Sequence, residues 1–193
     1  MGPTVYYIRH GQTDWNAELR FQGQRDIPLN AHGMSQAKAN GQKLKALIAD
    51  KPDIPFICSP MTRTRQTMSE IQAECGIAPE NYTIDERLIE ACYGDWEGQT
   101  LQEIKAKFPA LHKQRKAERW TFAPPNGESH KVLEARVSDW FESLTEDSVV
   151  VAHGVVGRVL RYLLLDLDPQ AAGEFVFPQD KICEIKRGQE IFH

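Results

Sequence analysis

Two apolar runs in this chain end in the same dipeptide, a histidine followed by a glycine. The first run is TVYYI at 4–8, and the pair after it begins at His10; the second is SVVVA at 148–152, and its pair begins at His153. Short, almost unbroken apolar runs are typical of strands buried on both faces of a sheet. Such sheets are parallel and covered by helices. This feature therefore favours an α/β fold with a histidine just beyond each of two strand ends.

The rest of the chain supplies the other elements of such a fold. Residues 55–58, PFIC, form a third apolar run, and the segment 182–193 is predicted to be a hairpin that turns at Arg187 and Gly188. Between these runs, apolar residues recur at steps of three and four, the spacing of one face of a helix. We interpret these stripes as core, and they lie at 34–48, 101–111, 133–144 and 155–163.

Length and composition exclude several classes of protein. A chain of 193 residues buries one substantial core, so we expect a single domain over 1–193. Its 41% of hydrophobic and 26% of charged residues argue against disorder. The net charge of −4 argues against nucleic acid as a main partner, because proteins that bind the phosphate backbone usually carry a basic excess. An anionic ligand must therefore be held by a local cluster of cations.

The sequence also indicates a cellular location. The first residues, MGPTVYYIRHG, lack the pattern of a secretory signal, and no apolar run is long enough to span a membrane. The four cysteines form no CxxC pair and suggest neither a disulfide framework nor a zinc ribbon; they are Cys58, Cys75, Cys92 and Cys183. We expect a cytoplasmic protein with no membrane partner.

Three strand ends carry residues that suit an anion. In an open parallel sheet, ligands bind beyond the carboxyl ends of the strands, where helices begin and where a glycine lets a ligand approach the backbone. The run at 55–58 is followed by Ser59, an expected N-cap, by Pro60 at the first helical position, and by Arg63 in the opening turn. Together with Arg9 and the two histidines, these residues are expected on one rim. That composition is typical of a phosphate site.

Each of these residues has a plainer interpretation when it is taken alone. A lone histidine at a strand end is more often structural than catalytic, and a lone arginine is usually a surface charge. Their combination is what points to phosphate chemistry. A metal site is disfavoured because the chain has no HxH and no HExxH motif. No GxGxxG or GxxxxGK[ST] motif indicates a nucleotide cradle, so neither a metal nor a cofactor is expected.

Six ordered blocks of the sequence carry a specific resemblance. They are IRHGQTDWN (8–16), RFQGQRDIPLNAHG (20–33), SPMTRTRQT (59–67), RLIEACYGDWEG (87–98), PPNGES (124–129) and VVAHG (150–154). In these blocks, which span most of the chain, the sequence resembles the histidine phosphatase superfamily in its phosphoglycerate mutase-like branch. The resemblance implies the fold of that family, a three-layer α/β/α sandwich with a mostly parallel central sheet.

The resemblance also implies roles for individual residues. His10 corresponds to the nucleophile that becomes phosphorylated, and Arg9 and Arg63 correspond to residues that bind the phosphoryl group. His153 corresponds to a further phosphate ligand, and Glu90, at the LxE position, to the proton donor. Substrate- or phosphate-binding positions that match more loosely are Asn16, Gln22, Gly23 and Gly154.

These residue types suit phosphoryl transfer without a metal. Fixed arginines stabilise charge that is spread over three equatorial oxygens, and they bind oxygens bidentately, which lysine cannot do. A neutral imidazole nitrogen is a good nucleophile and splits hydrolysis into two steps through a phosphohistidine. The other ring nitrogen of His10 must then be held by the backbone or by a neighbour.

Departures from the family pattern bear on the choice of activity. Gly154 stands where the acid phosphatase and phytase branch has an aspartate, which favours Glu90 as the donor. Cofactor-dependent mutases are longer and carry paired arginines in an inserted segment. Here Arg115, Lys116 and Arg119 are weak replacements, since basic residues in such a segment are more often a solvated helix face.

We therefore expect a metal-independent phosphomonoesterase that acts on a small phosphorylated substrate. A phosphoglycerate mutase is the alternative, and a non-catalytic module that binds a phosphorylated ligand is a third interpretation. Specificity is expected to lie in the segment 99–123, and the oligomeric state stays open, with a homodimer among the options. Gln179 stands where relatives frequently have asparagine, which leaves the last loop of the site undecided. Residues predicted to be structural or on the surface are Arg65, His32, His112, His130 and His193.

Overall fold

A six-stranded sheet runs through the middle of the computed structural model, which describes residues 2–193. The spatial order is β3-β2-β4-β1-β5-β6. Their bounds are Val5–Arg9 for β1, Phe56–Cys58 for β2, Thr83–Ile84 for β3, Ser148–Ala152 for β4, Ile182–Lys186 for β5 and Gln189–Phe192 for β6. Strands β3, β2, β4 and β1 are parallel, whereas β5 and β6 form an antiparallel hairpin at the edge beside β1.

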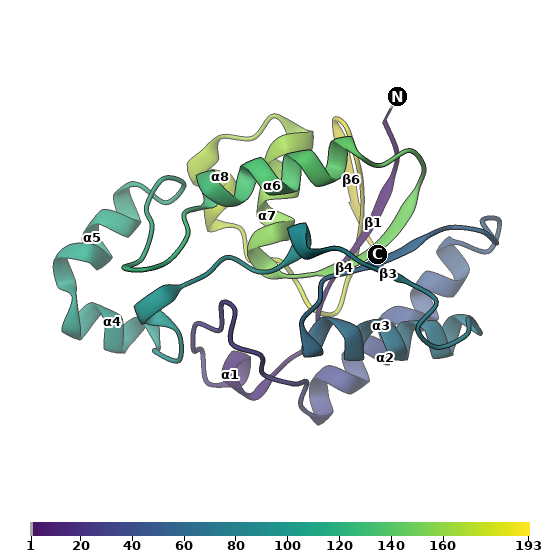
Figure 1. The fold of residues 1–193 in the computed structure, drawn as a ribbon, viewed down its shortest axis with the longest axis horizontal. Coiled ribbons are helices and arrows are strands. Elements are labelled where there is room, and N and C mark those ends of the chain that lie inside the picture. Colours follow the sequence, from purple (N-terminus) through teal and green to yellow (C-terminus); the bar gives the residue numbers. More distant parts are fainter. Residues whose placement is uncertain (1) are drawn as a thin grey trace.

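Helices cover both faces of this sheet (Figure 1). One face carries α2 (Ala31–Leu47) and α3 (Thr62–Cys75), and the other carries α6 (His130–Glu142) and α7 (Gly154–Leu165), with α8 (Pro169–Glu174) packed on α7. The short elements are α1 (Asp14–Ala17) and two turns of 3₁₀ helix, η1 (Glu86–Leu88) and η2 (Gly94–Trp96). The architecture is the expected three-layer α/β/α sandwich with a mostly parallel sheet.

Alternation along the strands explains why both faces need helices. In β1, Tyr7 packs into the cluster with α6 and α7, and its neighbour Ile8 packs into the cluster with α2 and α3; both side chains are fully buried. Successive side chains of a strand point to opposite faces. A run that is apolar at every position therefore has to be covered on both sides.

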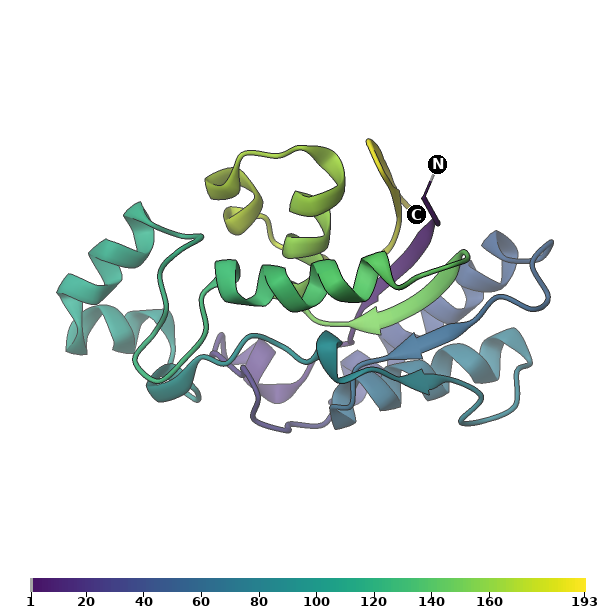
Figure 2. The same ribbon diagram turned by 45° about the horizontal axis from the view of Figure 1, so that its top comes forward.

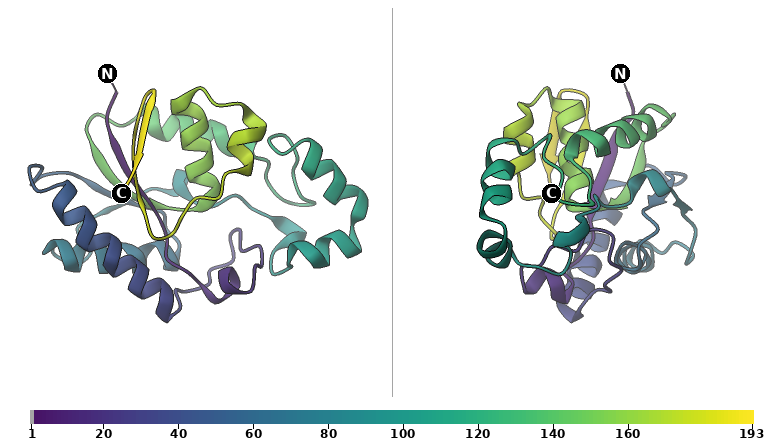
Figure 3. Two further views of the ribbon diagram at one scale, coloured as in Figure 1. Left: turned by 180° about the vertical axis from the view of Figure 1, so that it is seen from behind. Right: turned by 60° about the vertical axis from the view of Figure 1, so that its left-hand side comes forward.

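A helical arm extends from one end of this body (Figures 1, 2 and 3). It consists of α4 (Leu101–Lys107) and α5 (Pro109–Ala117), held by a small cluster around Trp96, Ile104 and Phe122. The sequence stripe at 101–111 predicted one helix, and this was wrong. The chain leaves the helical conformation at Phe108, where φ is −132° and ψ is 60°, because a residue before proline is disfavoured in the α region.

Other expectations can be compared with the structure directly. The stripes at 34–48 and 155–163 lie in α2 and α7, and the predicted hairpin is β5-β6, with Gly188 in its turn at φ 79°. The stripe at 133–144 lies in α6 as far as Glu142, and its last residue, Leu144, follows the C-cap Ser143. The helix begins three residues before the stripe because Ser129 accepts a hydrogen bond from the Val132 N–H as an N-cap. No helix within residues 2–193 has the length and apolarity needed to cross a bilayer.

The predicted start of α3 was wrong in detail. Met61 is the N-cap, without a side-chain hydrogen bond, and helix α3 begins at Thr62, so Pro60 lies outside the helix. Ser59 does not cap this helix. Its backbone N–H donates to the Val151 carbonyl at the end of the sheet, and its hydroxyl contacts the ring of His153. Arg63 nevertheless stands in the first turn, as expected.

Candidate active site

The two His-Gly pairs leave the sheet side by side. Strands β1 and β4 are parallel neighbours in which Arg9 lies opposite Ala152, so the next residues along each strand, His10 and His153, are brought together. The His10 N–H donates to the Ala152 carbonyl at 3.0 Å. The two imidazole rings meet edge to face, with 5.3 Å between their centroids. Both side chains are buried, so the sheet topology alone creates a paired histidine site.

His10 is held in one tautomer by its own neighbour. Its Nδ1 lies 2.7 Å from the Gly11 carbonyl oxygen. Since a carbonyl only accepts, Nδ1 carries the proton and Nε2 carries the free lone pair. Burial, followed by the charges of Arg63 and Arg9, places the pKa of His10 well below its ordinary value. His10 is therefore a neutral imidazole with an available nitrogen at neutral pH.

The glycines of the two pairs serve different purposes. A Cβ at Gly11 would lie 2.3 Å from the carbonyl oxygen of Gly33, so this glycine allows the N-terminus of α2 to pack against the loop. A Cβ at Gly154 would lie 3.4 Å from the Arg9 Nε. Both glycines were expected to make room for a ligand. In the structure, the groups closest to them are backbone at Gly11 and the guanidinium of Arg9 at Gly154.

Two arginines are fixed by backbone carbonyls. Arg63 donates to the carbonyls of Arg25 and Gly23 at 2.9 and 2.8 Å, and Arg9 donates to the Phe177 carbonyl at 2.7 Å. The Nε of each is buried and has no hydrogen-bond partner within residues 2–193. Burial lowers the pKa of both guanidiniums, which still remain cations at neutral pH. Each arginine thus keeps a fixed, charged donor that is not used by the protein.

His153 stands at the N-cap of α7 and is fully buried. Its Nε2 lies 2.7 Å from the hydroxyl of Ser59, and its Nδ1 has no partner among the described residues. The backbone is fixed as well, because the His153 N–H donates to the Tyr7 hydroxyl, which in turn donates to the His153 carbonyl. Burial, then Arg63 and then His10, hold the pKa of His153 well below its usual value.

Glu90 projects to the start of α7 from the loop after η1. Its Oε1 accepts from the Ala91 N–H at 3.0 Å, and its Oε2 accepts from the Val155 N–H at 3.3 Å. The loop itself is held by Arg136, which donates to the carbonyls of Arg87, Ile89 and Glu90. The carboxyl group is therefore buried, fixed and next to a helix N-terminus.

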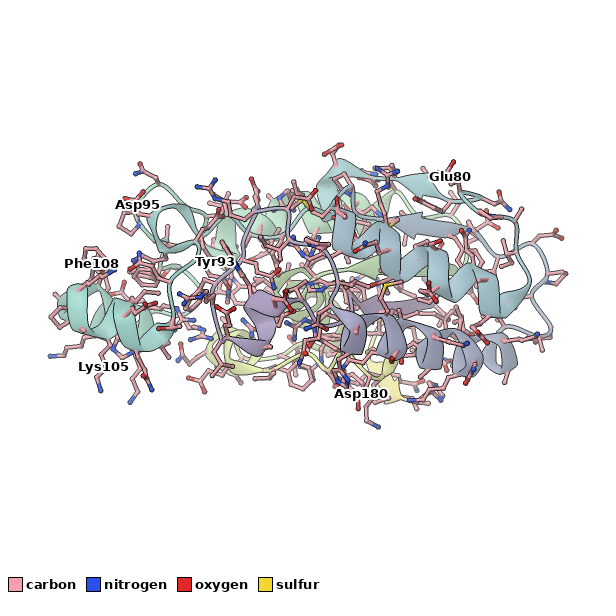
Figure 4. The ribbon with its side chains drawn as sticks, turned by 90° about the horizontal axis from the view of Figure 1, so that it is seen from below. Glu80, Tyr93, Asp95, Lys105, Phe108 and Asp180 are labelled. Atoms are coloured by element: carbon pink, nitrogen blue, oxygen red, sulfur yellow. The ribbon has the colours of Figure 1, made fainter. Side chains whose placement is uncertain are left out.

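These groups surround a pocket of about 120 Å³. The residues that line it are Arg9, His10, Asn16, Arg20, Phe21, Gln22, Gly23, Arg63, Glu90, Tyr93, Gly154, Val155 and Arg158. They include every candidate site residue from the sequence except His153, whose ring lies against His10. A larger hollow of about 430 Å³ lies near Glu80, at the end of the molecule away from Tyr93 (Figure 4), and no histidine, arginine or lysine lines it. The smaller pocket is therefore the candidate site.

Two side chains that do not line the pocket hold its walls. Gln179 donates from Nε2 to the His10 carbonyl and to the Asn16 Oδ1, both at 3.0 Å. The Asn16 oxygen is thereby occupied, so its amide nitrogen is the group left for a ligand. Glu97 accepts from the backbone N–H groups of Gln24 and Tyr93, which fixes two loops to each other.

Sequence reasoning missed some lining residues, namely Arg20, Phe21, Tyr93, Val155 and Arg158. A signal existed for four of them, since Arg20 and Phe21 lie inside the block that contains Gln22. Arg158 follows Gly154 by four residues and so shares its face of α7, and Tyr93 lies inside the block that contains Glu90.

The surface assignments were partly wrong. His130 is buried at the start of α6, where it packs edge to face on Trp120, because Arg119 and Gly173 of α8 lie against it. Burial lowers its pKa to about 3. Arg115 and Arg119 are half-buried, so the solvated helix face fits only Lys116 of the three basic residues. His32 and Arg65 are exposed, and His112 and His193 are partly exposed.

An α/β sandwich with paired histidines and arginines at its strand ends defines an anion-binding site suited to phosphoryl groups. The family model described as the histidine phosphatase superfamily (branch 1) matches residues 5–192. The chain therefore belongs to this family.

Its relatives include mutases and phosphatases. A 2,3-bisphosphoglycerate-dependent phosphoglycerate mutase from Mesorhizobium japonicum is 34% identical over 185 residues, covering 91% of this chain and 86% of the relative. A mycobacterial glucosyl-3-phosphoglycerate phosphatase, solved in complex with VO3, matches with a TM-score of 0.77 and 28% identity over 95% of this chain and 92% of that one. An Escherichia coli protein described as a putative alpha-ribazole-5'-P phosphatase has a TM-score of 0.79 at 22% identity, covers 100% of this chain and 95% of that one, and shares the fold.

Proposed function

We propose that this protein is a metal-independent phosphomonoester hydrolase that works through a phosphohistidine on His10. The observation that carries the proposal is the contact between His10 Nδ1 and the Gly11 carbonyl, which leaves Nε2 unprotonated in a pocket of fixed cations. A neutral nitrogen with a directed lone pair is the group that in-line attack on phosphorus requires. The phosphatase among the relatives supports the same choice of reaction.

The phosphoryl group is held by donors that the protein itself leaves unused. Arg9 and Arg63 each present an Nε–H, and the Asn16 side chain also lines the pocket. His153 does not line it, and its Nδ1, which has no partner among the described residues, is proposed as a further donor next to His10. Gln22, Gly23 and Gly154 complete the wall. Such fixed donors stabilise the charge that develops on the transferring oxygens, and they need no reorganisation during the reaction.

The reaction proceeds in two steps. In the first, the Nε2 lone pair of His10 forms a bond to phosphorus, the bond to the ester oxygen breaks, and Glu90 gives its proton to the departing alkoxide. In the second, water attacks phosphorus, the P–N bond breaks, and the Glu90 carboxylate takes a proton from that water. Inorganic phosphate and the alcohol are released, and Glu90 is again protonated for the next cycle.

No metal is assigned a role in either step. Within residues 2–193, no group of three or more His, Cys, Asp or Glu side chains is arranged to hold a metal ion. Guanidiniums of Arg9 and Arg63 line the pocket and supply positive charge there. We further propose that the protein acts in the cytoplasm on a small phosphorylated substrate, since its four cysteines are free thiols, as a reducing compartment would keep them.

A phosphoglycerate mutase is the second candidate, favoured by the identity of 34% to a mutase over most of both chains. Both candidates share the phosphohistidine and differ in its fate. A hydrolase passes the phosphoryl group to water, whereas a mutase protects it from water until an alcohol of the substrate accepts it.

The experiment is rapid quenching with ³²P-labelled substrate, followed by analysis of protein and products. We expect an acid-labile, base-stable adduct on the wild type, none on His10→Ala, and a normal adduct on His32→Ala, which changes an exposed histidine. Labelled phosphate should exceed labelled transfer product when 3-phosphoglycerate and 2,3-bisphosphoglycerate are supplied. Dominant transfer to the 2-position would establish the mutase, and an adduct on His10→Ala would remove His10 as nucleophile. Binding of phosphate without any turnover would leave a phospho-ligand-binding module.

A further inference from the structure

The buried face of α2 contains one polar side chain. The buried residues of this helix are Gly33, Ala37, Asn40, Gly41 and Leu44. Asn40 is fully buried, and its Oδ1 has no hydrogen-bond partner within residues 2–193. A buried polar atom without a partner costs free energy, and leucine has the same branching and number of heavy atoms without that cost. The amide nitrogen of Asn40 is therefore the group whose contact can explain an asparagine at this position.

The Asn40 amide reaches a loop of the candidate active site. Its Nδ2 donates to the Gln179 carbonyl at 3.0 Å. Gln179 lies in the segment 175–181, which joins α8 to β5 and contains no helix or strand. One turn further along α2, the Lys43 ammonium donates to the Asp180 carbonyl at 2.8 Å, and Figure 4 shows Asp180 beside this helix. Helix α2 therefore holds two successive carbonyls of the segment, the first through a buried side chain and the second through an exposed one.

The backbone of Gln179 has little other support. Its N–H and its carbonyl make no backbone hydrogen bond within residues 2–193. Arg9 holds the same segment, but it does so at the Phe177 carbonyl, two residues earlier. Backbone groups outside helices and strands need partners from side chains or water. The contact with Asn40 therefore fixes the Gln179 backbone directly.

The Gln179 side chain carries this support to the pocket. Its Nε2 donates to the His10 carbonyl and to the Asn16 Oδ1, both at 3.0 Å. A glutamine side chain loses much conformational entropy when its end is fixed, so these two hydrogen bonds depend on where the backbone of Gln179 lies. Asn40 does not line the pocket, and one hydrogen bond on each side of Gln179 connects it to Asn16, which does.

We propose that Asn40 is a positioning residue for the phosphoryl site and that it acts through Gln179. By holding the Gln179 carbonyl, it keeps the Gln179 amide within reach of Asn16 and so fixes the Asn16 side chain at the pocket wall. This inference rests on the proposed function, because that proposal assigns Asn16 to the phosphoryl group. It predicts that loss of the Asn40 amide weakens phosphate binding and leaves the chemical step intact.

The experiment is a double-mutant cycle between positions 40 and 179. The variants are Asn40→Leu, Gln179→Leu and the variant that carries both changes. Gln42→Leu, which removes an exposed amide from the same helix, is the matched control. The first measurement is the dissociation constant of inorganic phosphate by calorimetry, which needs no turnover, and the second is KM and kcat for p-nitrophenyl phosphate.

We expect Asn40→Leu to raise the dissociation constant and KM roughly 3- to 10-fold, the loss of about one hydrogen bond, with kcat changed less than about twofold. In the Gln179→Leu background the same change should have no further effect, because the amide that Asn40 positions is already absent. Gln42→Leu should match the wild type. Asn40→Ala, which removes the amide without adding apolar groups, should reproduce the result, and thermal unfolding shows that each variant is folded at the assay temperature.

Wild-type phosphate affinity and KM in Asn40→Leu would overturn the inference, and so would losses at positions 40 and 179 that multiply in the double variant. A loss in Asn40→Leu that Asn40→Ala does not share would assign the effect to the added apolar groups, and a fall in kcat at unchanged affinity would place the effect on the chemical step; either result contradicts the proposed role. A wild type that binds phosphate but releases none from p-nitrophenyl phosphate would instead contradict the proposed function, and the cycle in phosphate affinity would still decide the role of Asn40.

Discussion

The Ser59 hydroxyl lies 2.7 Å from the Nε2 of His153. Ser59 follows β2 and His153 follows β4, and these strands are parallel neighbours, so the contact depends on the register of the sheet. It fixes the rotation of the His153 ring, which packs edge to face on His10 and whose Nδ1 has no other partner among the described residues. Ser59, in the sequence block that contains Arg63, therefore positions the ring of His153, which is far away in the sequence.

Removing that hydroxyl should weaken catalysis without unfolding the protein. A neutral hydrogen bond contributes about 1 kcal/mol, so Ser59→Ala is expected to reduce kcat/KM for p-nitrophenyl phosphate roughly 5- to 10-fold. The melting temperature should change by only a few degrees. Ser69→Ala, which removes an exposed hydroxyl from α3, is the matched control. Unchanged kinetics in Ser59→Ala would show that the ring needs no such support.

The buried histidines should make stability depend on pH. Burial lowers the pKa of His130 to about 3, whereas an unfolded histidine titrates near 6.5. Between these values the unfolded chain binds a proton that the native chain does not, so the free energy of unfolding rises with pH and is lost as the pH falls below about 6.5. Well below that value, the loss is about 1.4 kcal/mol per pH unit for each such histidine. His10 and His153 act in the same direction.

Urea unfolding from pH 8 to pH 5 measures this effect. His130→Gln should give a shallower dependence on pH than the wild type below pH 6, by about 1.4 kcal/mol per unit. Between pH 7 and pH 8 the two slopes should agree, which serves as the internal control. Parallel curves over the entire range would mean that His130 takes up its proton in the native state.

Gln179 is expected to act through Asn16. Its amide donates to the Asn16 oxygen and to the His10 carbonyl, so Gln179→Leu removes both contacts and leaves the Asn16 side chain held only by the Thr13 N–H. We expect KM to rise roughly 5- to 10-fold, the value of about one hydrogen bond, with a smaller change in kcat. Gln189→Leu, an exposed change on β6, is the control. If kcat fell and KM did not change, Gln179 would be acting on the chemical step through His10.

The strand ends were predictable from the sequence because buried strands leave a local signal. The runs before His10 and His153 are apolar at nearly every position, and parallel pairing then brings their ends together. The position of Arg63 followed from the same reasoning. The individual roles of Asn16, Gln22 and Glu90 came from resemblance, and the structure places all three at the pocket without testing their roles.

What could not be predicted depends on contacts between distant segments. The burial of His130 arises because Arg119 and Gly173 pack over it, and no local pattern encodes that contact. The contact between Ser59 and His153 illustrates the same limit. A serine before a proline predicts a helix N-cap, and only the position of the neighbouring strand shows that its hydroxyl contacts His153 instead. The break at Phe108 could have been predicted from the proline that follows it. It was missed because the apolar spacing continues across the break and suggests one helix.

Chelation should leave activity unchanged. In the proposed mechanism, guanidiniums and imidazoles hold the phosphoryl group, and no carboxylate cluster for a divalent cation is found within residues 2–193. Incubation with EDTA and removal of the chelate should therefore give the same kcat/KM as untreated protein. Strong inhibition that is reversed by one added divalent metal would require a metal-assisted mechanism and would contradict the proposed one.

The leaving group distinguishes Glu90 as a proton donor from Glu90 as a structural residue. If Glu90 protonates the departing oxygen, its help matters most for an alkyl alcohol, which leaves as a strongly basic alkoxide, and least for p-nitrophenol, which leaves readily without a proton. General acid catalysis contributes roughly 10²- to 10⁴-fold where it is needed. Glu90→Gln keeps the size of the side chain and removes the transferable proton. It also replaces one acceptor of a backbone N–H with an amide nitrogen, a loss that should affect both substrates alike.

We therefore expect kcat/KM of Glu90→Gln to fall roughly 10²- to 10⁴-fold for an alkyl phosphate and far less for p-nitrophenyl phosphate. The measured quantity is kcat/KM because it reports the steps up to the first irreversible one, which include departure of the alcohol. Glu86→Gln, at an exposed position of η1, is the control and should show no contrast between the substrates. Glu97→Gln is a different comparison, since Glu97 accepts from the Gln24 and Tyr93 N–H groups and should lower both rates together by loosening the loops. Equal losses on both substrates in Glu90→Gln would assign Glu90 to positioning the start of α7 through the Val155 N–H, and the proton would have to come from another group.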